Sequence, residues 1–541
     1  MCKIAFAPCA FPPNPIPSPG RPETQFGSGA KLSRGACVLE HNSGRFIRRL
    51  QTRRYCFSGR GGKAMKTIDC SEKASLMQSP ATAHKVTTTT SEKRPSPRKF
   101  GIMSLFLLFT SALLLIGCGA QGDSDDDSGE PVTIRYVAPG DPHWSEPDRV
   151  VIERFLEQVP GIEVDRQSQE HGLSHYLSES PPPEVVMWLE SHELYDVAQQ
   201  NLLFDVSDIW AEHDLAEAYG RQFREVGRVD GTSRFIPVGF SWAGIYYNKE
   251  VFERYGLVLP TTWEEFGYIC DTLLANGETP LSVSGQDRRV NYLWFSYLNI
   301  RLNGPSFHRQ LIQGKESYKD ERLAAVWETW ISLFRRGYFI ESPSLTSAIG
   351  SMNALIRGDV NEPLTEKKAV MALAHHFIAG ELPPEFASEL DFFQFPQINP
   401  NLPAGEVTSV FGYVIPAGAA YHTQASAFVG YMASAEAQAM KMARIGEDPT
   451  NGGWAPLHRD VDRTLLPEAA RKGEEIVRGA DEVLPPLFSA LPITMQAGFG
   501  SVFDWLFAKL ETPETEIDVS EIQSTLEEAR QQALQNGDYR Q

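Results

Sequence analysis

The sequence predicts an α/β fold with a mostly parallel sheet. Runs rich in apolar and β-branched residues, such as "VTIRYVAP" from Val132 and "PEVVMWLE" from Pro183, predict buried strands. Segments with apolar residues at helical spacing lie between or after them, as in "DRVVIERFLEQ" and "SHELYDVAQQNLL". Because strands that alternate with helices form mostly parallel sheets, we expect a ligand beyond the carboxyl ends of these strands.

Later segments predict a long helical region followed by further strands. Thr262 and Glu265 in "TTWEEF" form a capping-box pattern at a helix start, and the chain is predicted to be largely helical from there to about Arg357. Strand candidates follow in "KKAVMALAHHFIAG", "DFFQFPQI" and "VTSVFGYVIPAG", and a final helix is expected around Ile522. A chain of 541 residues is too long for a single core, so two or three domains are expected.

Charge divides the chain into a basic start and an acidic body. The residues before Cys118 hold 18 of the 50 Lys and Arg residues but only 5 of the 69 Asp and Glu residues, which leaves 32 basic against 64 acidic residues in the rest. Such an acidic body repels phosphate backbones, which excludes nucleic acid as a partner. Residues 1–102 are rich in Pro, Ser, Thr and Arg, so we expect a disordered basic tail or an over-long translation start there.

A short apolar run after this tail predicts export. Basic residues precede residues 103–118, which are too short to cross a bilayer comfortably and end in Gly117 and Cys118. This pattern resembles a bacterial lipoprotein signal peptide, in which Cys118 would receive the lipid. A plain N-terminal anchor or a buried helix is the alternative. The acidic residues 119–130 would then be a flexible tether, and the mature protein would lie outside the cytoplasm on a bacterial membrane.

The segment "GIYYNKEVFERYGLVLPTTWEEF", from Gly244 to Phe266, carries a family resemblance. It is similar to the signature of the bacterial extracellular solute-binding proteins of ABC importers, and "NGETPLSVSG", "FFQFPQI" and "GYVIPAGAAYHTQASAFVGYMASAEAQ" follow in the family's order. The resemblance implies a two-lobed periplasmic-binding-protein fold with a hinge of two or three crossing segments. It also implies a small solute such as a sugar or sugar-like molecule, a membrane permease as partner, and a monomer.

Mapped onto this chain, the resemblance places the crossings near 244–248, 398–407 and 452–456. Lobe one would then comprise residues 131–247 with 408–452, and lobe two residues 248–407 with 453–541. The chain contains no G-x-x-x-x-G-K-[ST] motif, so ATP hydrolysis is assigned to another subunit.

Several side chains suit a sugar, which needs flat aromatic surfaces and bidentate polar groups. Trp242 is the strongest candidate for ligand contact. At most one of the neighbours Tyr246 and Tyr247 can face the cleft, because adjacent strand residues point to opposite faces. The predicted ligand-binding residues are Trp144, Trp188, Glu190, Trp242, Tyr246, Asn248, His375 and Trp454, with Asp141 and Arg288 as further hydroxyl partners. The pair His375–His376 stands where many family members have a Gly-Pro-Trp-like or Gly-rich turn, which departs from their pattern.

The sequence gives weaker support for other functions. "GFSWAG" resembles the G-x-S-x-G elbow of serine hydrolases around Ser241, but Ala replaces the second Gly and no helix is expected to follow. His171 and His175 have a zinc-like spacing in a loop-like segment without the expected Glu. A glycoside hydrolase or a lectin without a transport partner stays possible. We expect no enzyme activity, no cofactor and no metal site.

Overall fold

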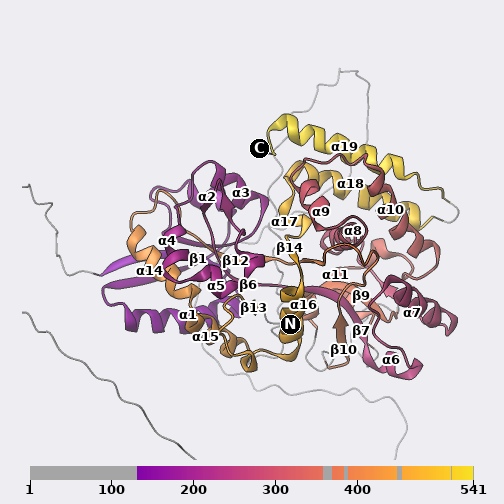
Figure 1. Cartoon of the computed structure of the whole chain (residues 1–541), viewed down its shortest axis with the longest axis horizontal. Helices are drawn as coiled ribbons and strands as arrows, with labels where there is room; N and C mark the ends of the chain where they lie inside the picture. The colour runs from indigo at the N-terminus through magenta and orange to yellow at the C-terminus, as the bar shows by residue number, and fades with distance from the viewer. Residues whose placement is uncertain (1–130, 357–367, 383–387, 447–453, 513–514, 540–541) are drawn as a thin grey trace, which may run out of the picture. The chain divides into compact units, whose positions relative to one another are not determined.

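The computed structural model describes residues 131–356, 368–382, 388–446, 454–512 and 515–539 (Figure 1). The predicted tail (1–102), the signal peptide ending at Cys118 and the tether (119–130) lie outside the described residues and stay predictions. Within the described part of the chain, no helix is both long enough and apolar enough to span a membrane.

The first sheet has six strands in the order β13-β6-β12-β3-β1-β2. They are β1 (Val132–Ala138), β2 (Ile162–Ser168), β3 (Val185–Leu189), β6 (Ile236–Phe240), β12 (Val410–Val414) and β13 (Ala455–Pro456). Strands β1, β2 and β3 pair in parallel, whereas β12 runs antiparallel to β3 and β6. This arrangement confirms the predicted α/β class. The prediction of a mostly parallel sheet is wrong, because β12 and β13 return to this sheet from late in the chain and pair antiparallel.

Helices and a short hairpin accompany this sheet. They are α1 (Pro142–Gln158), α2 (Leu173–Leu177), α3 (His192–Gln199), α4 (Ser207–Glu212), α5 (Leu215–Tyr219), α14 (His422–Ala433), α15 (Ala435–Gly446), and the hairpin of β4 (Arg228–Val229) and β5 (Thr232–Ser233). The Lys441 ammonium on α15 binds the buried Asp148 carboxylate on α1 at 2.6 Å and the Tyr413 hydroxyl on β12 at 2.9 Å. Two helices from distant parts of the sequence are thereby fixed to the same sheet.

The second sheet has four strands in the order β10-β7-β9-β8. They are β7 (Ala243–Asn248), β8 (Leu281–Ser282), β9 (Met371–His375) and β10 (Leu390–Phe393). Its helices are α6 (Lys249–Tyr255), α7 (Trp263–Ala275), α8 (Arg288–Asn303), α9 (Pro305–Ile312), α10 (Glu321–Arg335), α11 (Ala348–Asn353) and α12 (His376–Ala379). The predicted capping box is confirmed, since Thr262 Oγ1 accepts the Glu265 N–H at 3.2 Å and the Glu265 carboxylate accepts the Thr262 N–H at 3.1 Å.

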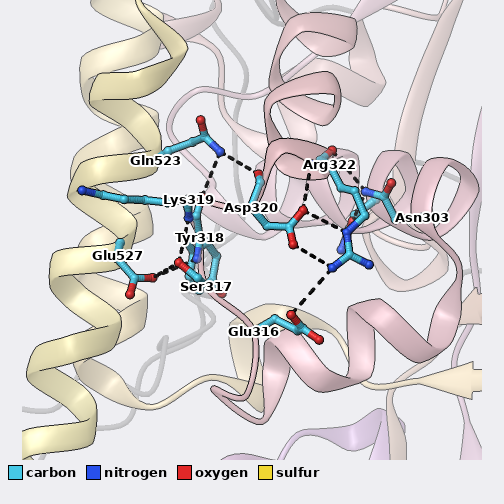
Figure 2. A network of polar contacts seen from close by, with 10 residues as sticks. Asn303, Glu316, Ser317, Tyr318, Lys319, Asp320, Arg322, Gln523 and Glu527 are labelled. Atoms are coloured by element: carbon cyan, nitrogen blue, oxygen red, sulfur yellow. Dashed lines mark hydrogen bonds and ion pairs between the residues drawn. The ribbon is translucent and has the colours of Figure 1, made fainter.

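Three C-terminal helices pack on the helices of the second sheet. They are α17 (Leu487–Ala490), α18 (Ile493–Leu510) and α19 (Val519–Asn536), and α18 and α19 lie side by side (Figure 1). Helix α16 (Glu468–Gly479) instead contacts β13 of the first sheet and Trp242. Each sheet with its helices is called a group below. Figure 2 shows how α19 is held: the Glu527 carboxylate accepts the Ser317 hydroxyl at 3.0 Å and the Tyr318 N–H at 2.9 Å. Burial raises the pKa of Glu527, but these bonds and the Arg530 guanidinium outweigh burial and lower the pKa to about 2.

The chain passes three times between the first sheet with its helices and the second sheet with its helices, and two of these segments form a separate two-stranded sheet of β11 and β14. Ser241 and Trp242 alone join β6 to β7, a segment from 394 to 409 joins β10 to β12 through β11 (Gly405–Val407), and α16 leads from β13 to β14 (Glu482–Leu484), which pairs with β11. The chain therefore leaves the first sheet at Phe240 and enters the second at Ala243, before the predicted lobe boundary at 247. Strand β13, which the prediction assigned to lobe two, pairs within the first sheet. The sequence gives no sign of this first crossing, because residues 236–248 are buried on both sides of it. The lobe limits themselves stay a prediction.

Candidate ligand-binding site

The carboxyl ends of strands from both sheets meet at the first crossing. In the first sheet, β3 ends at Leu189 and β6 ends at Phe240, where β12 and β13 begin. In the second sheet, β9 ends at His375, which is paired with Ala243, the first residue of β7. Because the β6–β7 connection is so short, the two edges lie together, as expected for a ligand site in an α/β protein.

Three aromatic rings form a cluster on the first-sheet side, here called the aromatic platform: Trp144, Phe411 and Trp454. The rings of Trp144 and Trp454 are nearly parallel, with an interplanar angle of 11° and centroids 6.2 Å apart. Phe411 meets both rings edge-on at 5.1 and 5.0 Å. Gly239 on β6 makes room for them, since a Cβ there would lie 2.2 Å from Trp454 and 2.6 Å from Phe411.

The platform joins two predicted residues that are far apart in the sequence. Trp144 lies in the first turn of α1, and Trp454 directly precedes β13. Trp144 and Phe411 are half-buried, whereas Trp454 is 6% exposed. Sequence reasoning missed Phe411, because a single Phe within a strand pattern is most often a core residue. Flat aromatic surfaces of this kind suit the apolar face of a sugar ring.

Trp188 and Glu190 lie beside this edge at the end of β3. The Trp188 indole N–H donates to Ser191 Oγ at 3.2 Å, and the same oxygen caps α3 by accepting the Leu194 N–H at 3.3 Å. Glu190 Oε1 accepts the Tyr195 hydroxyl at 2.7 Å. Burial raises the pKa of Glu190, and the Tyr195 hydrogen bond opposes that shift. Trp188 is therefore anchored within the protein, and Glu190 is a hydrogen-bonding group next to the edge.

Trp242 lies at the crossing and is 1% exposed. Its ring stacks on His376 with centroids 4.1 Å apart, and its other contacts include Gly473 on α16, where a Cβ would lie 2.2 Å from the indole. Tyr246 on β7 packs on Phe392 at 5.2 Å, and burial raises the pKa of its hydroxyl. These contacts place both rings in the packed interior of this structure.

Asn248 has a local structural role. Its Oδ1 accepts the Val251 N–H at 3.0 Å, which caps α6, and its Nδ2 donates to the Leu355 carbonyl at 2.9 Å. Asp141 likewise caps α1 through the His143 N–H at 3.1 Å, and Arg288 pairs with Asp504 at 2.8 Å. A role of these residues in ligand binding is still only predicted.

His375 lies in closely packed surroundings at the end of β9. Its side chain is fully buried, and neither ring nitrogen has a hydrogen-bond partner among the described residues. Burial lowers the pKa of His375 to about 3, helped by the nearby His376 and Arg289. The space bounded by His375, Arg289, Val407 and Phe488 is too small to hold a water molecule. A neutral imidazole offers one donor and one acceptor, as a hydroxyl group does.

Phe377 and Arg289 extend this side of the site and were missed by sequence reasoning. The half-buried Phe377 ring stacks on His375 at 5.1 Å with an angle of 10°, and the Arg289 guanidinium lies 5.7 Å from the Phe377 centroid. Arg289 is held by Asp287 through two hydrogen bonds of 2.5 and 3.0 Å. The departure from the family turn at His375–His376 was the one available signal, since Phe377 follows it directly.

Ser241 links two crossing segments. Its Oγ accepts the Ser409 N–H at 3.1 Å, its carbonyl accepts the Thr408 hydroxyl, and its own N–H donates to the Ser409 carbonyl at 2.9 Å. Ser241 is 2% exposed. The serine of the "GFSWAG" motif thus has a structural role at the hinge.

His171 and His175, the candidate zinc ligands, lie next to each other. The rings of His171 and His175 lie 4.0 Å apart. Within the described ranges, no group of three or more His, Cys, Asp or Glu side chains is arranged to hold a metal ion.

Two α/β sheets joined by three crossings, with strand ends facing one another at the first crossing, define a two-lobed ligand receptor. The chain belongs to the bacterial extracellular solute-binding protein family, whose sequence model matches residues 143–439. It is thus the solute-binding component of an ABC importer. The predicted family and two-lobed fold are confirmed.

Individual relatives are distant in sequence. The osmoprotective compounds-binding protein GgtB of Synechocystis sp. is 22% identical over 395 residues, which covers 70% of this chain and 88% of that protein. The solved structure of the solute receptor AcbH has a TM-score of 0.65 and 20% identity, with 74% of this chain and 98% of AcbH covered. RafE from Streptococcus pneumoniae, in its apo form, has a TM-score of 0.59 and 19% identity, with 76% of this chain and all of RafE covered.

Proposed function

We propose that this receptor captures a neutral sugar or sugar-like solute between the two sheet edges and delivers it to an ABC permease. The aromatic platform carries the proposal, because stacked aromatic rings at a strand edge fit the apolar face of a pyranose. Glu190 on one side and His375 on the other supply hydrogen-bonding groups for hydroxyls.

Three features favour an uncharged solute. His375 is neutral at physiological pH because its pKa is lowered to about 3. The Arg289 guanidinium near His375 is paired with the Asp287 carboxylate, so its positive charge is not free to attract an anion. The AcbH receptor prefers β-D-galactopyranose, and GgtB binds osmoprotective compounds, which is in line with this class.

The same proposal includes the remaining expectations from the sequence. The protein works as a monomer without catalytic activity, is anchored outside the cytoplasm through a lipid on Cys118, and contacts the permease with both lobes. A serine hydrolase is disfavoured because Ser241 Oγ is buried and bonded to Ser409. A lectin without a transport partner differs only in lacking a permease, and co-purification with the permease distinguishes the two.

The test is thermal unfolding of the full chain against a panel of sugars, polyols, amino acids and glycerophosphodiesters. A ligand that binds only the folded state raises its stability by RT ln(1 + [L]/Kd), about 2.7 kcal/mol at a hundredfold excess over Kd. We expect a shift with one class of sugar or polyol. No shift with any sugar or polyol, or hydrolysis of a sugar ester or glycoside, contradicts the proposal.

Variants then locate the site. Trp144→Ala removes the more exposed tryptophan of the platform and is expected to weaken binding of the identified sugar about tenfold or more, as loss of an aromatic anchor does. Trp505→Ala is the matched control, since Trp505 is also half-buried but lies on α18. Equal effects of the two variants on affinity would contradict the assignment of the platform.

A further inference from the structure

Helix α16 touches both sheet groups of the receptor. It follows β13, which belongs to the first sheet, and precedes β14, which pairs with β11. Gly473 packs on Trp242, the residue that joins the two sheets directly. A helix in this position has to move relative to at least one group whenever the two groups move relative to each other.

The C-terminal end of α16 is bonded firmly to the first group. The Arg478 guanidinium donates to the carbonyls of Tyr219 at 3.3 Å, Pro456 at 3.0 Å and Leu457 at 2.9 Å. It also binds the buried Glu474 carboxylate at 2.6 Å. Buried, charge-assisted bonds of this number are strong, and breaking them would leave both a buried charge and buried carbonyls without partners.

The middle of α16 is bonded to the second group by one ion pair. Lys472 Nζ lies 2.8 Å from both carboxylate oxygens of Asp391 on β10, and it also lies 5.0 Å from the centroid of Phe392. The side chains of Lys472 and Asp391 are 32% and 35% exposed, so water can replace each partner at modest cost. This exposed ion pair is therefore a weaker attachment than the buried bonds of Arg478.

We infer that the Lys472–Asp391 pair is the releasable end of a brace formed by α16, and that it biases the two lobes toward the arrangement in this structure. The brace extends the proposed function by naming a contact, outside the ligand site, that sets how readily the lobes move. Because an exposed ion pair contributes little, its removal is expected to shift the lobe equilibrium only about threefold to fivefold.

The test measures inter-lobe distance without ligand, so it does not depend on the identity of the solute. Two fluorophores are attached to the full chain through unnatural amino acids at the exposed positions Gln199 on α3 and Glu264 on α7, and single-molecule energy transfer gives the distance distribution. We expect Lys472→Met to deplete the population with the distance of this structure. Lys472→Arg, which keeps the charge, and Lys319→Met, which removes an exposed lysine elsewhere, should leave that population unchanged.

Each result of this experiment either supports or overturns the inference. An unchanged distribution in Lys472→Met overturns the inference, and so does an equal shift in Lys472→Arg or Lys319→Met. Thermal unfolding of each variant checks that it is folded. Failure of the sugar panel with a shifted distribution in Lys472→Met would contradict the proposed solute class and leave the brace intact.

Discussion

The buried ion pair at the second crossing gives a stability prediction that can be worked out from the structure. The Arg301 guanidinium on α8 binds the Glu406 carboxylate on β11 and the carbonyls of Gly405 at 2.5 Å and Phe395 at 3.3 Å. Glu406 also accepts the Tyr297 hydroxyl at 2.8 Å. Both charged side chains are almost fully buried. Arg301→Met leaves the carboxylate buried without its cation, which is expected to cost about 3–5 kcal/mol of unfolding free energy.

Urea unfolding followed by circular dichroism and tryptophan fluorescence measures this loss. The double variant Arg301→Met/Glu406→Gln removes both charges and is expected to recover a large part of it, since a neutral pair carries no desolvated charge. Arg149→Met, which breaks an exposed pair with Glu153, should cost far less than Arg301→Met, because solvent screens that pair. The reasoning is refuted if Arg301→Met costs no more than Arg149→Met, or if the double variant is as unstable as Arg301→Met alone.

Three further predictions concern local contacts. Thr262→Ala removes the cap of α7 and should lower the unfolding free energy by about 1 kcal/mol in chemical denaturation; an unchanged value would show that the cap contributes nothing. The pKa of Glu527 is lowered from 4.5 to about 2 in the folded chain, so its stabilisation is complete above pH 4.5 and is lost as the pH falls toward 2. The difference in melting temperature between the native chain and Glu527→Gln should therefore shrink across that window, and a constant difference would contradict the assignment. Ser241→Ala leaves the Ser409 N–H without an acceptor, with an expected loss of about 1–3 kcal/mol, and a fluorophosphonate probe should not label the native chain. Labelling at Ser241 would restore the hydrolase alternative.

The features that sequence reasoning predicted well depend on local or periodic patterns. The capping box at Thr262 involves residues three positions apart, and β3 is a continuous apolar run. The contact between Trp144 and Trp454 could be expected from the rule that ligand sites lie beyond strand ends, because both residues lie near strand ends at one edge of the sheet.

The features it missed depend on contacts between distant segments. Nothing near Trp242 in the sequence indicates that Gly473 on α16 packs against its ring. Asn248 resembles a cleft residue in the sequence, but Val251 and Leu355 engage its amide in the fold. The change of sheet at Ser241 was invisible because the buried pattern continues through it without a break.

Hydrogen exchange of the backbone amides, with and without the sugar identified by thermal unfolding, tests the central claim most directly. The account predicts added protection at the ends of β3 and β6 and in residues 375–380, because those segments form the facing edges of the site. Protection confined to the groove lined by α10, α18 and Ile517 on the second group, with none at these edges, would contradict it.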